Sequence, residues 1–144
     1  MSTSSSPAPS TAQRGILAVD DEEPIRGLLK YYLGPKYDLV TTSSAEEAQE
    51  ALHTRSFQLV ITDIGLPGQT GFDLCETVKQ NHPDTVIMMI TGLFDAQYAK
   101  RAIDAGVFSF LTKPIDFKRL LTVVEDALKH QAMLAARRAK RAAR

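Results

Sequence analysis

The stretch Phe57–Leu74, FQLVITDIGLPGQTGFDL, opens with an apolar run that ends in an acidic residue, Asp63. Residues 57–63 are rich in β-branched and aromatic side chains and therefore predict a short β-strand. Four further runs of this kind occur, each separated from the next by an amphipathic stretch of helical type. The predicted strands are residues 15–20, 37–42, 57–63, 85–91 and 107–111.

The stretches between these strands carry helix signals. Pro24 suits a first helical turn, and Ser44 with Glu47 has the spacing of a capping box. An apolar stripe from Phe117 to Leu128 predicts the last helix. Five strands with helical crossovers predict an α/β fold, namely a flavodoxin-like, doubly wound five-stranded parallel sheet of order 2-1-3-4-5 with helices on both faces.

Length and composition predict a single folded domain. The chain has 144 residues, of which 44% are hydrophobic and 24% are charged, as in ordinary globular domains. The single cysteine, Cys75, cannot form an internal disulfide, and neither a signal peptide nor an apolar run of membrane-spanning length is recognisable. These features lead us to expect a cytoplasmic protein.

The ends of the chain differ from its middle. Residues 1–14 are rich in Ser and Pro and hold almost nothing apolar, so we expect a disordered tail there. Residues 15–128 form the predicted domain. Residues 129–144 hold six of the 17 basic residues and no acid, which leaves 11 basic against 17 acidic residues in the rest of the chain. We interpret this segment as a basic helical extension or linker.

Polar side chains collect where the predicted strands end. The first strand is followed by Asp20 and Asp21, the third ends at Asp63, the fourth ends at Thr91, and Lys113 lies just beyond the fifth. Ligands of open α/β sheets bind at the carboxyl ends of the strands. Three carboxylates at this edge would repel one another, whereas a hard cation would hold them together. Mg²⁺ is the predicted cation because the set contains neither His nor Cys.

The same residues provide the parts needed for phosphoryl transfer. This chemistry requires a nucleophile, a cation that offsets charge on the transferred group, and donors to its equatorial oxygens. Asp63 is the predicted nucleophile, with the Thr91 hydroxyl and the Lys113 ammonium beside it. Each residue alone would also fit a plain role as a helix cap, turn, strand or solvated loop residue. The interpretation depends on their occurring together at one edge of the sheet.

At these positions the sequence strongly resembles the receiver domain of bacterial two-component response regulators, from Gly15 to about Leu128. The most specific piece is VITDIGLPGQTGFDL, with the phosphoacceptor Asp63, Pro67 four residues later and Gly71 eight residues later. The acidic pair after the first strand, the Thr-Gly pair after the fourth and the Lys-Pro pair after the fifth complete the resemblance.

The resemblance implies a role for each matching residue in the site. Asp21 and Asp63 would contact Mg²⁺ directly, Asp20 would act largely through water, and the backbone carbonyl of Gly65 would be a further ligand. Lys113 would pair with the phosphoryl group, and its bond to the following proline would be cis. These assignments imply a phosphorylatable switch that assists its own phosphoryl transfer and hydrolysis, and they do not imply an enzyme with a separate substrate.

The resemblance also implies a switch and partners. Thr91 would move toward the phosphoryl group and let the ring of Phe110 turn inward, which changes the face made by the fourth helix, fifth strand and fifth helix. Many relatives have Tyr at the position of Phe110, so this ring lacks their hydroxyl. A histidine kinase or phosphotransfer protein would donate the phosphoryl group, and a protein partner or output domain would read the face. Homodimerisation is left open, a membrane role is not expected, and nucleic-acid binding by this chain alone is not expected.

Other functions fit the sequence less well. A small phosphatase with an aspartyl nucleophile would need a second acid two residues after Asp63, where the chain has Gly65. A flavin mononucleotide site would need a phosphate loop where the chain has Asp-Asp-Glu-Glu, and the glycine motifs of dinucleotide and nucleotide sites are missing. A degenerate receiver that only docks partners is the remaining alternative. The cognate kinase, and whether the chain is a whole regulator or part of a longer protein, cannot be deduced from the sequence.

Overall fold

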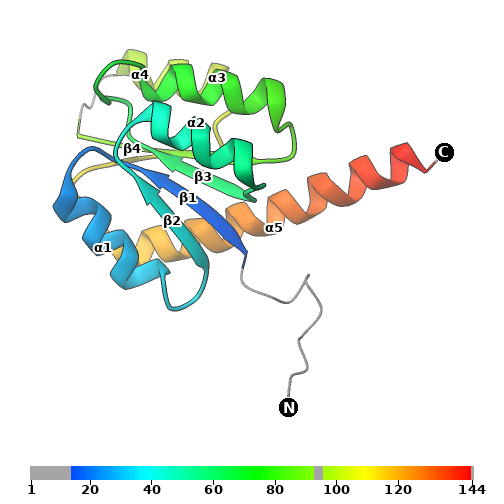
Figure 1. Ribbon diagram of the computed structural model, residues 1–144, viewed down its shortest axis with the longest axis horizontal. Coiled ribbons are helices and arrows are strands. Elements are labelled where there is room, and N and C mark those ends of the chain that lie inside the picture. The colour runs from blue at the N-terminus through cyan, green and yellow to red at the C-terminus, as the bar shows by residue number, and fades with distance from the viewer. Residues whose placement is uncertain (1–13, 93–95, 144) are drawn as a thin grey trace.

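The computed structural model describes residues 14–92 and 96–143, so the expected disordered tail lies outside the described residues except for Arg14. Five parallel strands form one sheet in the order β2-β1-β3-β4-β5 (Figure 1). This is the predicted topology. The strands are β1 Gly15–Val19, β2 Asp38–Thr42, β3 Leu59–Thr62, β4 Val86–Thr91 and β5 Ser109–Thr112.

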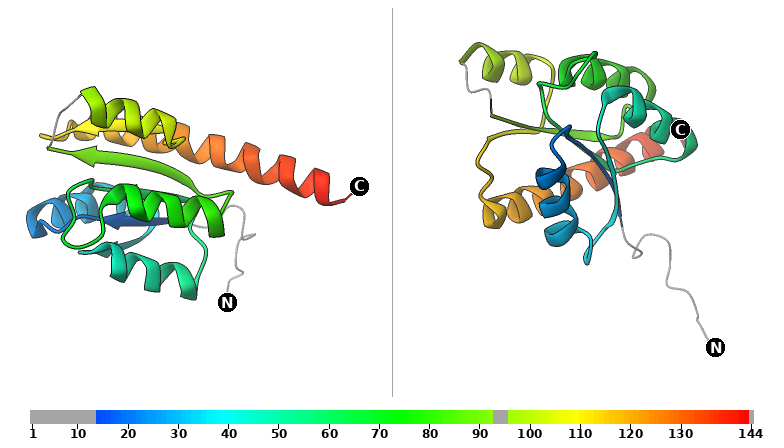
Figure 2. Two further views of the ribbon diagram at one scale, coloured as in Figure 1. Left: turned by 90° about the horizontal axis from the view of Figure 1, so that it is seen from above. Right: turned by 60° about the vertical axis from the view of Figure 1, so that its left-hand side comes forward.

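Five helices cover both faces of this sheet. Helices α1 and α5 lie on one face, and α2, α3 and α4 lie on the other (Figures 1 and 2). Each side has its own apolar core, and all side chains of β1, β3 and β4 are buried between the two layers. The helices are α1 Glu23–Leu33, α2 Ala45–Thr54, α3 Gly71–Asn81, α4 Ala96–Asp104 and α5 Phe117–Ala142.

The strand ends differ slightly from the predicted ones. The third strand begins at Leu59 instead of Phe57, and the fifth begins at Ser109 instead of Val107. The Val107 amide donates to the carbonyl of Ala102, so this residue lies in the turn that follows α4. Apolar side chains can be buried in such turns as well as in strands, which is why the apolar pattern predicted strands that begin too early.

The helix signals were largely correct, with one detail changed. Ser44 caps α2 by accepting from the Glu47 amide, as predicted. In a capping box the Glu47 carboxylate would accept from the amide of Ser44. Here it accepts instead from the amide and hydroxyl of Ser43, at 2.8 Å each. Helix α3 has a complete capping box between Thr70 and Asp73 that we had not predicted.

The loop between β3 and α3 folds tightly over the end of β3. The Gly71 amide donates to the Ile64 carbonyl at 2.9 Å. A Cβ atom at Gly71 would overlap the carbonyl oxygen of Asp63, so only glycine fits this close approach. The first turn of α3 is thereby held against the backbone of Asp63.

Helix α5 continues well past the sheet. It starts at the N-cap Asp116, whose carboxylate accepts from two backbone amides, and runs as one helix to Ala142 (Figure 1). It leaves the sheet at the amino ends of the strands, on the side opposite the predicted site (Figure 1). Within residues 14–92 and 96–143, every helix is too short or too polar to cross a lipid bilayer.

Candidate functional site

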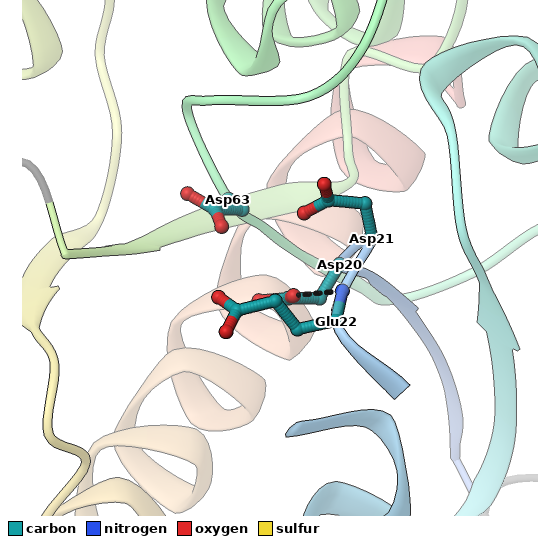
Figure 3. Close-up of side chains that lie close together, drawn as sticks. All are labelled: Asp20, Asp21, Glu22 and Asp63. Carbon is teal, nitrogen blue, oxygen red and sulfur yellow. Dashed lines mark hydrogen bonds between the residues drawn. The ribbon is translucent and has the colours of Figure 1, made fainter. Parts of the chain in front are cut away.

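The carboxyl ends of β1 and β3 bring four acidic side chains together. Carboxylate oxygens of Asp20, Asp21, Glu22 and Asp63 lie within 4.8 Å of one another (Figure 3). Asp20 and Asp63 are buried, whereas Asp21 and Glu22 are exposed. The sequence predicted three members of this cluster and missed Glu22.

The ammonium of Lys113 lies among these carboxylates. Its Nζ is 2.9 Å from Asp20 Oδ2, 2.7 Å from Glu22 Oε2 and 2.9 Å from Asp63 Oδ2. The Lys113–Pro114 peptide bond is cis, as the resemblance implied. The cluster therefore contains the cation that the sequence placed at this edge, and the structure shows that it contacts three carboxylates at once.

Burial and charge act in opposite directions on the pKa values of this cluster. Burial raises the pKa of Asp20, although hydrogen bonds from Lys113 and the Glu22 amide work to lower it. Burial works to lower the pKa of Lys113, but hydrogen bonds to Glu22, Asp20 and Asp63 outweigh it and raise that pKa. Lys113 therefore stays protonated in the folded protein, whereas burial disfavours the ionised form of Asp20.

Backbone contacts fix the two buried carboxylates. Asp20 Oδ1 accepts from the Glu22 amide at 2.8 Å, and Arg26 Nη1 donates to the Asp20 carbonyl oxygen at 2.8 Å. Asp63 Oδ1 accepts from the Gly65 amide at 3.2 Å while its Oδ2 accepts from Lys113. Each oxygen of Asp63 is thus oriented by a different donor.

The donor set suits a hard divalent cation. It consists of carboxylate oxygens, and two of the side chains are open to solvent, so water and a phosphate oxygen can complete the coordination that Mg²⁺ prefers. Gly65 is exposed in the loop that follows Asp63, and its amide faces Asp63. The role of the Gly65 carbonyl as a ligand stays a prediction.

The predicted switch residues lie on β4, which is next to β3 in the sheet, and on β5, the strand beyond it. Thr91 is fully buried at the end of β4, and its carbonyl oxygen accepts from the Lys113 amide at 2.8 Å. Phe110 pairs with Met89 across β4 and β5, is partly buried, and packs against the core under α2, α3 and α4. The backbone hydrogen bond between Thr91 and Lys113 joins the end of β4 to the segment that follows β5. A change at the site could pass between the two strands through this bond.

Glu22 was overlooked although the sequence contained a signal for it. It follows Asp20 by two residues, and the hydrogen bond from its amide to Asp20 turns the chain into α1 at this point. A helix start directly after two acids places the next acid at the same edge of the sheet. The run Asp-Asp-Glu-Glu is thus a signal for a fourth carboxylate as well as an argument against a phosphate loop.

The fold and the acidic cluster at the carboxyl ends of β1 and β3 agree with one protein family. The response regulator receiver domain family matches residues 16–125, which is most of the chain. The chain belongs to this family of two-component signalling domains. The recognition from sequence and the predicted fold class are confirmed.

Among similar proteins, the response regulator protein PilR of Pseudomonas aeruginosa is 43% identical over 114 residues, 78% of this chain and 26% of PilR. The DNA-binding transcriptional regulator NtrC of Escherichia coli strain K12 is 34% identical over 120 residues, 82% of this chain and 26% of NtrC. This chain thus spans about a quarter of the length of these relatives.

A solved structure with the same fold is the signal receiver domain of an HD domain-containing protein from Pseudomonas fluorescens Pf-5. It is 32% identical with a TM-score of 0.85, and the match covers 90% of this chain and 97% of that one. The basic extension at the end of α5 lies beyond the part matched by the family.

Proposed function

We propose that the domain accepts a phosphoryl group on Asp63 from a histidine kinase or phosphotransfer protein, in a reaction that depends on Mg²⁺. The observation that carries this proposal is the setting of the Asp63 carboxylate. It is buried, its two oxygens are held by Lys113 and the Gly65 amide, and it faces the acidic group at the end of β1. A fixed carboxylate beside a cation site is what in-line phosphoryl transfer needs.

In the proposed reaction, an Asp63 oxygen attacks the phosphorus of a phosphohistidine, and a P–O bond forms as the P–N bond breaks. The electron pair of the broken bond stays on the histidine nitrogen of the donor. Asp20, Asp21 and Asp63 hold Mg²⁺, with Glu22 available as a further oxygen donor. When bound, the ion offsets charge on the transferred group. Lys113 turns from the carboxylates to an oxygen of the phosphoryl group, a change of acceptor that lysine makes readily because it binds as a point charge.

The signal then passes through Thr91 and Phe110. The Thr91 hydroxyl moves toward the phosphoryl group, and the Phe110 ring turns further into the space that it leaves. Phe110 carries no hydroxyl, so packing alone decides between its two positions. The changed surface is the one made by α4, β5 and α5, and a protein partner or an output domain reads it.

The partners of the whole protein are part of this proposal. PilR and NtrC are named as regulators, and this chain matches about a quarter of each. We infer that the domain acts in the cytoplasm, as a phosphorylated switch that controls an output module or a separate protein. It carries no substrate-defining insertion between Asp63 and α3, which agrees with a signalling switch more than with an enzyme acting on a separate substrate.

The test is labelling with acetyl phosphate and Mg²⁺, followed by intact-mass measurement. The wild type should gain the mass of one phosphoryl group, and the gain should disappear in EDTA. Asp63→Asn should abolish the gain, while the control Asp104→Asn, at an exposed position on α4, should label like the wild type. Undiminished labelling of Asp63→Asn would show that another residue is the nucleophile.

A further inference from the structure

The half of α5 that extends beyond the domain has a strongly basic surface. Residues 129–143 hold Lys129, Arg137, Arg138, Lys140 and Arg141 and no acid. Arg138 forms an ion pair of 2.5 Å with Asp84, which holds the extension against the loop before β4. Arg137 and Arg141 lie one helical turn apart beside a groove of about 430 Å³. The other described basic groups of this extension are exposed and make no ion pair in the described part of the chain.

An acidic surface lies on the other side of the molecule. Helix α2 carries Glu46, Glu47 and Glu50 and neither Lys nor Arg. Helix α3, which packs beside α2, exposes Asp73 and Glu76. We call the exposed carboxylates of these five residues the α2–α3 acidic face.

Helices α2 and α3 carry one Lys and no Arg between them, and Arg26 of α1 acts on Glu47 from the neighbouring helix. In helix α3 the one lysine, Lys79, donates to the Ala105 carbonyl oxygen at the end of α4. Glu46 and Glu50 are one helical turn apart, so their spacing matches that of Arg137 and Arg141.

The two surfaces cannot meet within one molecule. Helix α5 covers the face of the sheet opposite to α2 and α3 (Figure 1). The first turns of α2 and α3 follow the carboxyl ends of β2 and β3, whereas the extension of α5 leaves at the amino ends. The first turns of α2 and α3 and the extension of α5 therefore lie at opposite ends of the sheet (Figure 2).

We propose that the basic extension of α5 docks on the α2–α3 acidic face of a second copy of this chain. Arg137 and Arg141 of one molecule pair with Glu46 and Glu50 of the other, because both pairs rise by about 6 Å along their helices. The contact joins two different surfaces, so each copy keeps one free surface of each kind and association continues head to tail. Exposed ion pairs contribute little each, so the association is weak and sensitive to salt.

A nucleic acid fits this extension less well than an acidic protein surface does. Residues 129–144 contain no Phe, Tyr or Trp that could stack on a base. The rest of the chain, with its excess of acids, would repel a polyanion, whereas it supplies the complementary surface for a second copy.

The test is sedimentation velocity of the full chain over a concentration series. In about 0.01 M salt, where the screening length is about 30 Å, the weight-average mass should rise above the monomer mass with concentration. In about 1 M salt, where this length is about 3 Å, it should return to the monomer mass of 15.8 kDa. A wild type that stays monomeric in low salt at every concentration overturns the proposal.

Charge reversal then identifies the surfaces. Two double variants reverse one surface each: Arg137→Glu/Arg141→Glu makes the extension acidic, and Glu46→Lys/Glu50→Lys makes part of the α2–α3 acidic face basic. Each variant alone should be monomeric in low salt, because its two surfaces then carry like charge. A mixture should associate, because the acidic extension of the first variant can bind the basic face of the second. Lys30→Glu/Lys36→Glu, at two exposed positions near the end of α1, changes net charge as much as the first variant does and should associate like the wild type. Association by the mixture also shows that both reversed variants are folded.

Three outcomes would overturn the assignment. If each reversed variant still associates in low salt, or if their mixture does not, these surfaces are not the contact. Binding of duplex DNA by a monomeric wild type, lost in Arg137→Glu/Arg141→Glu and in high salt, would assign the extension to nucleic acid instead. The proposal is independent of phosphorylation, so Asp63→Asn should associate like the wild type.

Discussion

Lys113→Met is the most informative change in this protein, because it removes the ammonium and keeps most of the alkyl chain. In the folded domain that ammonium contacts three carboxylates, of which Asp20 and Asp63 are buried. Removing one partner of a buried ion pair costs about 3–5 kcal/mol. The Lys113 side chain is 13% exposed and that of Glu22 is 57% exposed, so water replaces part of the lost interaction. We therefore expect a loss of about 2–3 kcal/mol.

The loss is measurable by thermal and urea unfolding in EDTA. For a domain of this size, 1 kcal/mol corresponds to about 4 °C in Tm, so the Tm should fall by about 8–12 °C. Mg²⁺ should then raise the Tm of Lys113→Met more than that of the wild type, because in the variant the ion offsets carboxylate charge that the ammonium no longer offsets. Lys118→Met, at an exposed position in the first turn of α5, is the control and should change the Tm little.

Two results would refute this reasoning. If Lys113→Met unfolds at the wild-type urea concentration in EDTA, the carboxylates do not depend on the ammonium. If Mg²⁺ stabilises the variant and the wild type equally, the ammonium and the metal do not compensate the same charges. The second result would also weaken the proposal that Lys113 turns toward the phosphoryl group when the metal is bound.

Three further changes test other parts of the structure. Burial raises the pKa of Asp20, so its ionised form is disfavoured in the folded state and Asp20→Asn should raise the Tm in EDTA at pH 7. This gain in Tm should shrink as the pH falls toward 3.8, the ordinary pKa of Asp, and a lower Tm of the variant at pH 7 would contradict the prediction. Gly71→Ala should cost about 1–3 kcal/mol in urea unfolding and slow the labelling of Asp63, since its Cβ overlaps the Asp63 carbonyl oxygen; an unchanged urea midpoint would show that the loop adapts. The Cys75 thiol is buried and its pKa is raised by burial, so it should react with a thiol reagent at pH 8 only as fast as the domain opens, and immediate stoichiometric reaction would exclude this packing.

Much of the fold was predictable because the three central strands are buried on both faces. Strands β1, β3 and β4 are buried throughout, so their sequences are nearly continuous apolar runs of the kind that suits a parallel sheet covered on both faces. The boundaries were less predictable, since Phe57 is buried just outside β3 as completely as the residues inside it. Burial is a property that strands and tight turns share.

The site was predictable to the extent that topology determines it. Side chains that follow parallel strands meet at one edge whatever their detailed geometry, and this brought Asp20, Asp63 and Lys113 together. The contacts among them depend on side-chain directions that no sequence pattern records. The bond between Glu22 and Lys113 joins residues 91 positions apart, and it fixes which carboxylates share the cation.

These contacts suggest how the proposed phosphorylation reaches the rest of the domain. Lys113 is bound through its ammonium to the acidic cluster and through its amide to the Thr91 carbonyl oxygen. A phosphoryl group on Asp63 would draw the ammonium away from Asp20 and Glu22, and the Thr91 hydroxyl would approach the same group from β4. Because the backbone bond ties the two residues together, the ends of β4 and β5 have to adjust as a unit. Phe110 lies on β5 three residues before Lys113, so this adjustment acts directly on the strand that carries its ring.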